Sequence, residues 1–206
     1  MITAIVLAAG AGQRMGGKGK ALVELDGQSF LERVISTCRE GGCEDVWVVV
    51  RAGDRETEES ARSLGARVTT NPDPERGMFS SVQIGIQTAL GDPDLPRPST
   101  GDATPLQGCL VFPVDHPRVH ADTVRTLINK LSSVGGDTFL QPTTGNRGGH
   151  PIVLSVEGAG KLLDQKPTLV FRDALAQAGL SPTRIPVPDP HIRENMNLPS
   201  DLTGSG

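Results

Sequence analysis

The chain has 206 residues, a formal net charge of −4, 36% hydrophobic residues and 21% charged residues. This balance is typical of a single folded globular domain and argues against wholesale disorder. Aromatic residues make up 3% and tyrosine is absent, so the composition favours neither a base-stacking surface nor a basic patch for nucleic acid.

The cysteines and the hydropathy pattern bear on where the protein works. Cys38, Cys43 and Cys109 are odd in number and lack C-x-x-C spacing, which favours reduced thiols over a disulfide framework or a zinc knuckle. No stretch approaches the roughly 20 apolar residues of a membrane span, and no signal-peptide pattern opens the sequence. We therefore expect a cytoplasmic protein with no membrane partner.

The first predicted element is a buried strand over residues 4–9, an apolar run that stops at a glycine-rich loop. Residues 10–20 hold five glycines, one arginine and two lysines. Glycine lets backbone N–H groups approach oxygen atoms closely, and the cations attract negative charge. We interpret this loop as a site for nucleotide phosphates.

The first half continues with alternating helix and strand patterns. Apolar residues at helical spacing indicate amphipathic helices, and β-branched runs indicate strands covered on both faces. In order, the sequence predicts a helix over 31–38, a strand over 46–50, a helix over 54–64, a strand over 67–70, and a helix with Met78, Val82, Ile86 and Leu90 turned inward. This alternation is typical of a parallel α/β sheet.

The second half is less regular. Residues 92–107 contain four prolines and predict an exposed, mobile excursion within a single domain, 1–206. Beyond it we expect a strand over 109–114, a helix over 124–131, a strand over 138–141, a flexible loop over 145–149, a strand over 152–154, and helices over 157–164 and 168–178.

Two familiar phosphate-loop patterns fail in the glycine-rich loop. The dinucleotide fingerprint needs G-x-G-x-x-G, whereas Gly10, Gly12 and Gly16 are spaced G-x-G-x-x-x-G. A Walker A loop needs Ser or Thr after its lysine, where this chain has Gly19. The sequence therefore argues against hydride transfer from a dinucleotide and against hydrolysis by a P-loop enzyme.

A third pattern fits. Residues 7–16, LAAGAGQRMG, followed by residues 20–27, KALVELDG, resemble the signature of MobA-like nucleotidyltransferases, which include molybdopterin cytidylyl- and guanylyltransferases. Further blocks of that family pattern occur in order: a nucleobase and ribose segment over 71–85, a metal-aspartate strand end over 113–117, an acceptor-side motif over 149–151 and a closing segment over 195–202. The resemblance implies a single Rossmann-like α/β domain, with a mainly parallel mixed sheet, one later antiparallel strand, and helices on both faces.

The resemblance also implies a two-substrate site. Arg14, Lys20 and Asp115 are the expected catalytic residues, with Mg²⁺ held by Asp115 and Asn197. The expected acceptor contacts are His150 and Asn195. The expected nucleotide contacts are Leu7, Ala8, Ala9, Gly10, Gly12, Arg14, Lys20, Asn71, Gly77 and Ser81.

These residue types suit nucleotidyl transfer, in which an acceptor phosphate attacks the α-phosphorus of an NTP and pyrophosphate leaves. The protein must align two anions and neutralise their charge. Magnesium needs few protein ligands because it keeps waters and binds phosphates directly. No general base is needed if the acceptor phosphate is already ionised. Simpler roles stay open: Asp115 as a helix N-cap, Lys18 as a solvated side chain, and His116 as either a catalytic acid or an orienting residue.

The identity of both substrates rests on the resemblance. Cytidylyl-transferring members usually carry Leu-Ala-Ala-Gly, as here, and guanylyl-transferring members Leu-Ala-Gly-Gly; the extra methyl of Ala9 would narrow the base pocket. We therefore expect CTP as donor and molybdopterin as acceptor, with a molybdoenzyme or chaperone as a further partner. The alternatives are a sugar- or polyol-phosphate acceptor, and a non-catalytic nucleotide-binding accessory protein for molybdoenzyme maturation.

Overall fold

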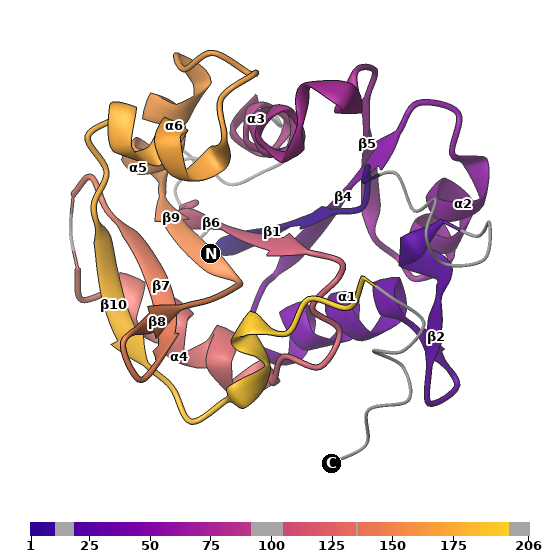
Figure 1. Ribbon diagram of the computed structural model, residues 1–206, viewed down its shortest axis with the longest axis horizontal. Helices are drawn as coiled ribbons and strands as arrows, with labels where there is room; N and C mark the ends of the chain where they lie inside the picture. Colours follow the sequence, from indigo (N-terminus) through magenta and orange to yellow (C-terminus); the bar gives the residue numbers. More distant parts are fainter. Residues whose placement is uncertain (11–18, 92–104, 135, 198–206) are drawn as a thin grey trace.

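The computed structural model describes residues 1–10, 19–91, 105–134 and 136–197. Its centre is an eight-stranded mixed sheet of order β10-β7-β9-β6-β1-β4-β5, with β8 paired to β7 (Figure 1). The strands are β1 (Ile2–Leu7), β4 (Asp45–Arg51), β5 (Arg67–Asn71), β6 (Gly108–Pro113), β7 (Phe139–Thr144), β8 (Arg147–Gly148), β9 (Ile152–Ser155) and β10 (Pro182–Pro186). A separate hairpin pairs β2 (Glu24–Leu25) with β3 (Gln28–Ser29).

The strand directions confirm the predicted mixed sheet. β1 lies between β4 and β6 and runs parallel to both, and β5 extends this parallel half. β9 runs antiparallel to both β6 and β7, and β10 returns parallel to β7 at the sheet edge. The carboxyl ends of β1 and β6 are in register, with Leu7 opposite Pro113. Loops that leave these two strands therefore emerge side by side.

Helices cover both faces, as predicted. They are α1 (Phe30–Glu40), α2 (Arg55–Ser63), α3 (Met78–Gly91), α4 (Ala121–Leu131), α5 (Val156–Leu163) and α6 (Phe171–Gln177), with short 3₁₀ turns η1 (Lys20–Leu22), η2 (Pro74–Arg76) and η3 (Pro190–Arg193). Figure 1 shows α3, α5 and α6 on one side of the sheet and α1 and α4 on the other. None of the helices within the described ranges is both long enough and apolar enough to cross a membrane.

Alternation along β1 divides the core into two layers. Ala4 and Val6 pack with α1, α2 and α4, whereas Ile5 and Leu7 pack with α3, α5 and α6. This follows from the two-residue period of a strand, which sends successive side chains to opposite faces. All of β1 is buried, because helices cover it from both sides.

Gly85 sets how closely α3 approaches β1. A Cβ at this position would lie 2.2 Å from Ile5 Cγ2, so the helix backbone rests directly on the strand. Glycine costs a helix about 1 kcal/mol relative to alanine, and here it permits close packing. Gly85 is the last residue of the segment that the resemblance assigns to the nucleobase and ribose. Helix packing alone accounts for a glycine at this position.

Three expectations from the sequence are corrected. Met78 is not turned inward: it is 44% exposed at the first residue of α3, because the helix begins at the surface after the turn at Gly77. The loop over 145–149 is shorter than expected, because Arg147–Gly148 form β8 and pair with β7. Residues 105–107 of the proposed excursion are anchored to the chain start, since the Met1 ammonium donates to Pro105 O and Gln107 N donates to Met1 O. Residues 92–104 lie outside the described part.

Candidate active site

A cavity of about 380 Å³ lies at the carboxyl ends of β1 and β6, beside the start of α3. In open α/β sheets this edge is where ligands bind. Its lining comes from five separate stretches of the chain: Leu7, Ala8, Ala9, Gly10, Lys20, Pro74, Gly77, Met78, Ser81, Pro113, Val114, Asp115 and Asn197. Nine of these residues are among those the sequence predicts for the nucleotide and its metal.

The chain after β1 forms one wall of this cavity. Ala8 N donates to Val49 O at 2.9 Å, and Val114 N donates to Leu7 O at 3.1 Å, so residues 7–8 remain tied to both neighbouring strands. Ala9 follows and is 2% exposed, whereas Gly10 is open to solvent. The backbone therefore leaves the sheet at a fixed place before the glycine-rich loop begins.

Lys20, Asp115 and Asn197 meet inside the cavity although they come from distant parts of the sequence. Lys20 Nζ donates to Asp115 Oδ2 at 2.8 Å and to Asn197 Oδ1 at 2.5 Å. The Lys20 and Asp115 side chains are 17% and 23% exposed, so the ion pair is partly shielded from water. One ammonium group thus holds both predicted metal ligands in position.

The donor set at Asp115 fits a magnesium ion. Asp115 Oδ1 is buried and makes no hydrogen bond within the part of the chain that the structure describes, although a buried carboxylate oxygen ordinarily has a partner. Asp115 and Asn197 supply a carboxylate and an amide oxygen, the ligand types that Mg²⁺ prefers.

His116 lies directly behind Asp115. Its Nε2 is 3.6 Å from Asp115 Oδ1 and its side chain is 7% exposed. Burial lowers the pKa of His116, and the Asp115 carboxylate partly opposes that shift. The imidazole is therefore largely neutral at pH 7. This state favours an orienting role beside Asp115 over a role as catalytic acid.

Asn71 does not line the cavity but positions the start of α3. Its Nδ2 donates to Ser80 Oγ and Ser81 Oγ, both at 2.9 Å, and its Oδ1 accepts from Asp73 N. Asn71 is 1% exposed. Ser81 does line the cavity, so Asn71 acts on the predicted nucleotide site through Ser81.

Gly77 connects η2 to α3 and lines the same cavity. Its φ of 101° lies in a region that side-chain-bearing residues rarely adopt. This glycine turns the chain so that α3 begins at the cavity mouth, where Met78 is exposed.

A second, larger cavity of about 690 Å³ adjoins the first, because Met78 lines both. Its walls come from β7, β9, α6 and β10, and combine apolar side chains with two arginines: Phe139, Gln141, His150, Ile152, Val170, Phe171, Arg172, Leu175, Ala176, Gly179, Leu180, Ser181, Pro182 and Arg184, in addition to Met78. Val170 at its rim is 65% exposed. An apolar hollow with exposed cations at its edge is typical of a site for an organic anion.

His150 lines this second cavity and lies next to the first. Its ring centroid is 5.1 Å from that of His116, and His116 adjoins Asp115. Burial lowers the pKa of His150 to about 4, with a smaller contribution from His116. At neutral pH the side chain is an uncharged group between the two cavities.

The chain from η3 to Asn197 packs against His150 and Asp115. His150 N donates to Ile192 O at 2.8 Å, and Met196 N donates to Asp115 O at 2.8 Å. A Cβ on Gly149 would lie 2.3 Å from Ile192 O, so only glycine lets η3 dock this closely. Asn197 reaches the site, whereas Asn195, two residues earlier, is exposed and does not line either cavity.

Several predicted residues cannot be placed. Gly12, Arg14 and Lys18 fall in residues 11–18, outside the described part. Conversely, the second cavity contains residues that the sequence did not single out, such as Phe171 and Arg184. They lie in α6 and β10, where the sequence carries no recognisable site motif.

Comparison with known proteins agrees with this geometry. The MobA-like NTP transferase domain matches residues 4–180. A nicotine blue oxidoreductase from Paenarthrobacter nicotinovorans is 29% identical over 187 residues, which are 82% of this chain and 84% of that protein. A molybdenum cofactor guanylyltransferase from Shewanella putrefaciens is 28% identical over 136 residues, 66% of this chain and 60% of that protein.

Among solved structures, a nucleotidyl transferase from a Methanothermobacter species superposes with a TM-score of 0.75 at 20% identity, covering 98% of this chain and 94% of that one. This likeness shows the shared fold. The family match extends over most of the chain, from the first strand to the end of α6, and includes the strand ends that build the cavity. The chain therefore belongs to the MobA-like NTP transferase family.

Proposed function

We propose that this protein transfers a cytidylyl group from CTP to a phosphorylated acceptor, molybdopterin, and releases pyrophosphate. The observation that carries the proposal is the meeting of Lys20, Asp115 and Asn197 in the cavity after β1. It joins a phosphate-binding cation to two oxygen ligands at the edge of the sheet where the family's nucleotides are expected.

The reaction forms a bond between an acceptor phosphate oxygen and the α-phosphorus of the NTP, and breaks the bond to the pyrophosphate oxygen. The two reactants repel each other, so catalysis depends on alignment and charge neutralisation. Asp115 and Asn197 would hold Mg²⁺, which when bound neutralises charge on the triphosphate. Lys20 adds a second cation and, through its two hydrogen bonds, keeps these oxygen ligands in place.

The two cavities offer a place for each substrate. The smaller one presents backbone and small side chains after β1, which suits a triphosphate. The larger one is apolar, with Arg172 and Arg184 at its edge, which suits an organic acceptor that carries a phosphate. His150 and His116 lie where the two cavities approach each other, so an acceptor phosphate near His150 would be close to Asp115.

The choice of CTP rests on Ala9, which is 2% exposed and lines the smaller cavity. A glycine at this position would enlarge the pocket by one methyl group and make room for a purine. The choice of molybdopterin follows the named activity of the Shewanella relative, and a sugar phosphate or polyol phosphate is the alternative acceptor.

The test is pyrophosphate release with a panel of four NTPs, each combined with molybdopterin, a sugar phosphate or a polyol phosphate, in the presence of Mg²⁺. The proposal expects turnover with CTP and molybdopterin. Turnover with another acceptor would keep the reaction and replace that substrate. Nucleotide binding without turnover for any pair would favour the non-catalytic accessory protein.

A second function deserves a parallel assay because the Paenarthrobacter relative, matched over 82% of this chain, is named an oxidoreductase. The apolar walls of the larger cavity, including Phe139 and Phe171, would also accept a flat dye. Oxidation of a nicotinamide cofactor on addition of such a dye, without pyrophosphate release, would favour this function over nucleotidyl transfer.

A further inference from the structure

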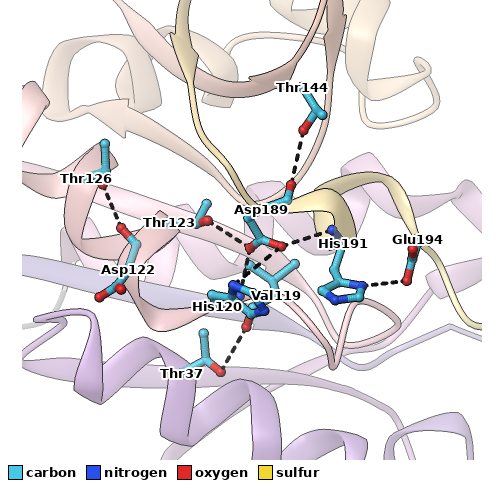
Figure 2. A network of polar contacts seen from close by, with 10 residues as sticks. All are labelled: Thr37, Val119, His120, Asp122, Thr123, Thr126, Thr144, Asp189, His191 and Glu194. Carbon is cyan, nitrogen blue, oxygen red and sulfur yellow. Dashed lines mark hydrogen bonds and ion pairs between the residues drawn. The ribbon is translucent and has the colours of Figure 1, made fainter. Parts of the chain in front are cut away.

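A polar cluster outside both cavities joins the start of α4 to η3 (Figure 2). His120, Asp189 and His191 each offer one ligand atom, and these atoms all lie within 4.8 Å of one another. We propose that these three side chains bind a transition-metal ion of the zinc type. This proposal does not depend on the reaction that the protein catalyses.

Asp189 is the fixed ligand of the cluster. It is 2% exposed, and its Oδ2 accepts from His120 N and Thr123 Oγ1, both at 2.8 Å. Its Oδ1 accepts from His191 N at 2.9 Å. A carboxylate oxygen has two lone pairs, so Oδ1 keeps one for a cation. The carboxylate is thus rigid before any ion binds.

The histidines contribute two imidazole rings on either side of this carboxylate. His120 Nδ1 is 3.9 Å from Asp189 Oδ1, and the two ring centroids are 5.4 Å apart at an interplanar angle of 67°. Figure 2 shows both rings beside Asp189. A tetrahedral zinc site with bonds of about 2.0 Å needs ligand atoms about 3.3 Å apart. His120 is 58% exposed, so rotation of its side chain can close the difference.

Glu194 gives His191 the arrangement that metal-bound histidines usually have. Its Oε2 lies 2.7 Å from His191 Nδ1, so the carboxylate fixes a proton on Nδ1 and leaves Nε2 as the metal-binding nitrogen. Arg118 Nη1 lies 4.0 Å from the same carboxylate oxygen.

The residue types select the ion. Imidazole nitrogens suit zinc, nickel and copper, whereas magnesium prefers oxygen ligands. The capping of α4 accounts for Asp189 by itself, since His120 makes no side-chain cap for this helix. It does not account for two imidazoles that each have a ligand atom within 4.8 Å of this carboxylate, one of which is paired with Glu194.

A bound ion would fasten α4 to the segment that leads into the catalytic cavity. Thr144 Oγ1 already donates to Asp189 O at 3.1 Å, and Met196 N, five residues after His191, donates to Asp115 O. The site would therefore stabilise the chain that carries Asn197 without contacting either substrate cavity.

The test is a calorimetric titration of Zn²⁺ into protein without a histidine tag, stripped of metal by a chelator. We expect saturable binding of one ion, unaffected by millimolar Mg²⁺. Binding should weaken by more than about 100-fold in His120→Ala and in His191→Ala, and by about 10- to 100-fold in Glu194→Gln. Glu58→Gln, an exposed carboxylate on α2 paired with Arg62, is the control and should bind like the unmodified protein.

Both alanine variants keep the backbone N–H groups that bind Asp189, so they should fold, and melting temperatures in excess chelator check this. Absence of saturable Zn²⁺ binding would overturn the proposal. Unchanged binding in both histidine variants would also overturn it, because the ion would then sit elsewhere, for instance at the buried Cys38 and Cys43 thiols. His120→Gln provides a second variant if the alanine form is unstable.

Discussion

The two cavities are built in different ways. The smaller one is formed where β1 and β6 end in register and is lined by small residues, one lysine and one aspartate. The larger one is formed by late elements, α6 and β10 among them, and its lining is mostly apolar with cations at the rim. Met78 lies between the two and lines both.

We connect the smaller cavity with the reaction itself and the larger cavity with the choice of acceptor. A triphosphate and its metal make the same demands in every nucleotidyl transfer, and parallel strand ends meet those demands at fixed positions. The acceptor varies, and the larger cavity, which we propose for it, depends on elements that pack together only in the folded chain. Substitutions on one side should therefore affect the reaction itself, and substitutions on the other side should affect which acceptor is used.

The largest effect is expected at Asp115. We predict that Asp115→Ala and Asp115→Asn each lower kcat by at least about 100- to 1,000-fold, because both remove a charged oxygen ligand beside the reacting phosphates. Pyrophosphate release under saturating CTP and Mg²⁺ measures this. Asp137→Asn, a half-exposed carboxylate that lines neither cavity, is the control. Activity close to normal in Asp115→Asn would remove the metal role from this residue.

Lys20→Ala should have the next largest effect, a fall in kcat of about 100-fold. The substitution removes a cation and also frees Asp115 and Asn197 from their shared partner. The same assay, run at several Mg²⁺ concentrations, should show a raised Mg²⁺ requirement. If Lys20→Ala changes only the KM for NTP, then Lys20 binds substrate equally in the ground state and the transition state.

Ala9→Gly tests the base specificity of the smaller cavity. Removal of one methyl group changes discrimination by about 10-fold or more, so the ratio of kcat/KM for CTP to that for GTP should fall by at least about 10-fold. Competition between the two nucleotides in one reaction measures the ratio directly. An unchanged ratio would mean that Ala9 does not contact the base.

On the acceptor side, Arg184→Ala should raise the KM for the phosphorylated acceptor about 10-fold and leave the KM for CTP unchanged, because loss of a hydrogen bond to a charged group costs about 1.5 kcal/mol. Arg62→Ala, an exposed arginine on α2, is the matched control. Equal changes for both substrates would contradict the division of labour between the cavities.

The last expected effect is on stability in acid and does not involve turnover. Burial holds the pKa of His150 at about 4 in the folded protein, below its ordinary value of 6.5. Between these values the unfolded chain binds more protons than the folded chain, so stability falls as pH drops from 6.5 towards 4, by at most about 1.4 kcal/mol per pH unit. Urea unfolding at several pH values should show a smaller loss for His150→Gln. The same slope in both proteins would contradict the burial of this imidazole.

Much of the smaller cavity could be predicted from the sequence because strand ends carry local signals. The apolar run before Gly10 and the strand before Asp115 both stop where a ligand edge is expected, and Lys20 follows at the spacing of a known signature. Asn197 was predicted as a metal ligand, and the structure places its side chain on Lys20. The sequence also predicted the order of the main-sheet strands and of the helices through α4, but not the β2–β3 hairpin.

The remainder depends on tertiary packing that leaves little trace in the sequence. β10 begins and ends with proline, a residue that argues against a strand in a sequence pattern. Both prolines are tolerated because β10 is an edge strand that pairs only with β7 within the described sheet. Met78 follows the inward stripe of α3 by spacing, yet it lies at the exposed first residue. The close approach of Gly149 to η3 is likewise visible only once both are folded.

The central claim is that the smaller cavity is the donor site for nucleotidyl transfer, and CTP labelled at the α-phosphorus tests it most directly. With Mg²⁺ and molybdopterin, the label should move to the acceptor with one pyrophosphate released per transfer, and Asp115→Ala should abolish the movement. Failure of the label to move to any phosphorylated acceptor, or its movement at an undiminished rate in Asp115→Ala, would contradict this account.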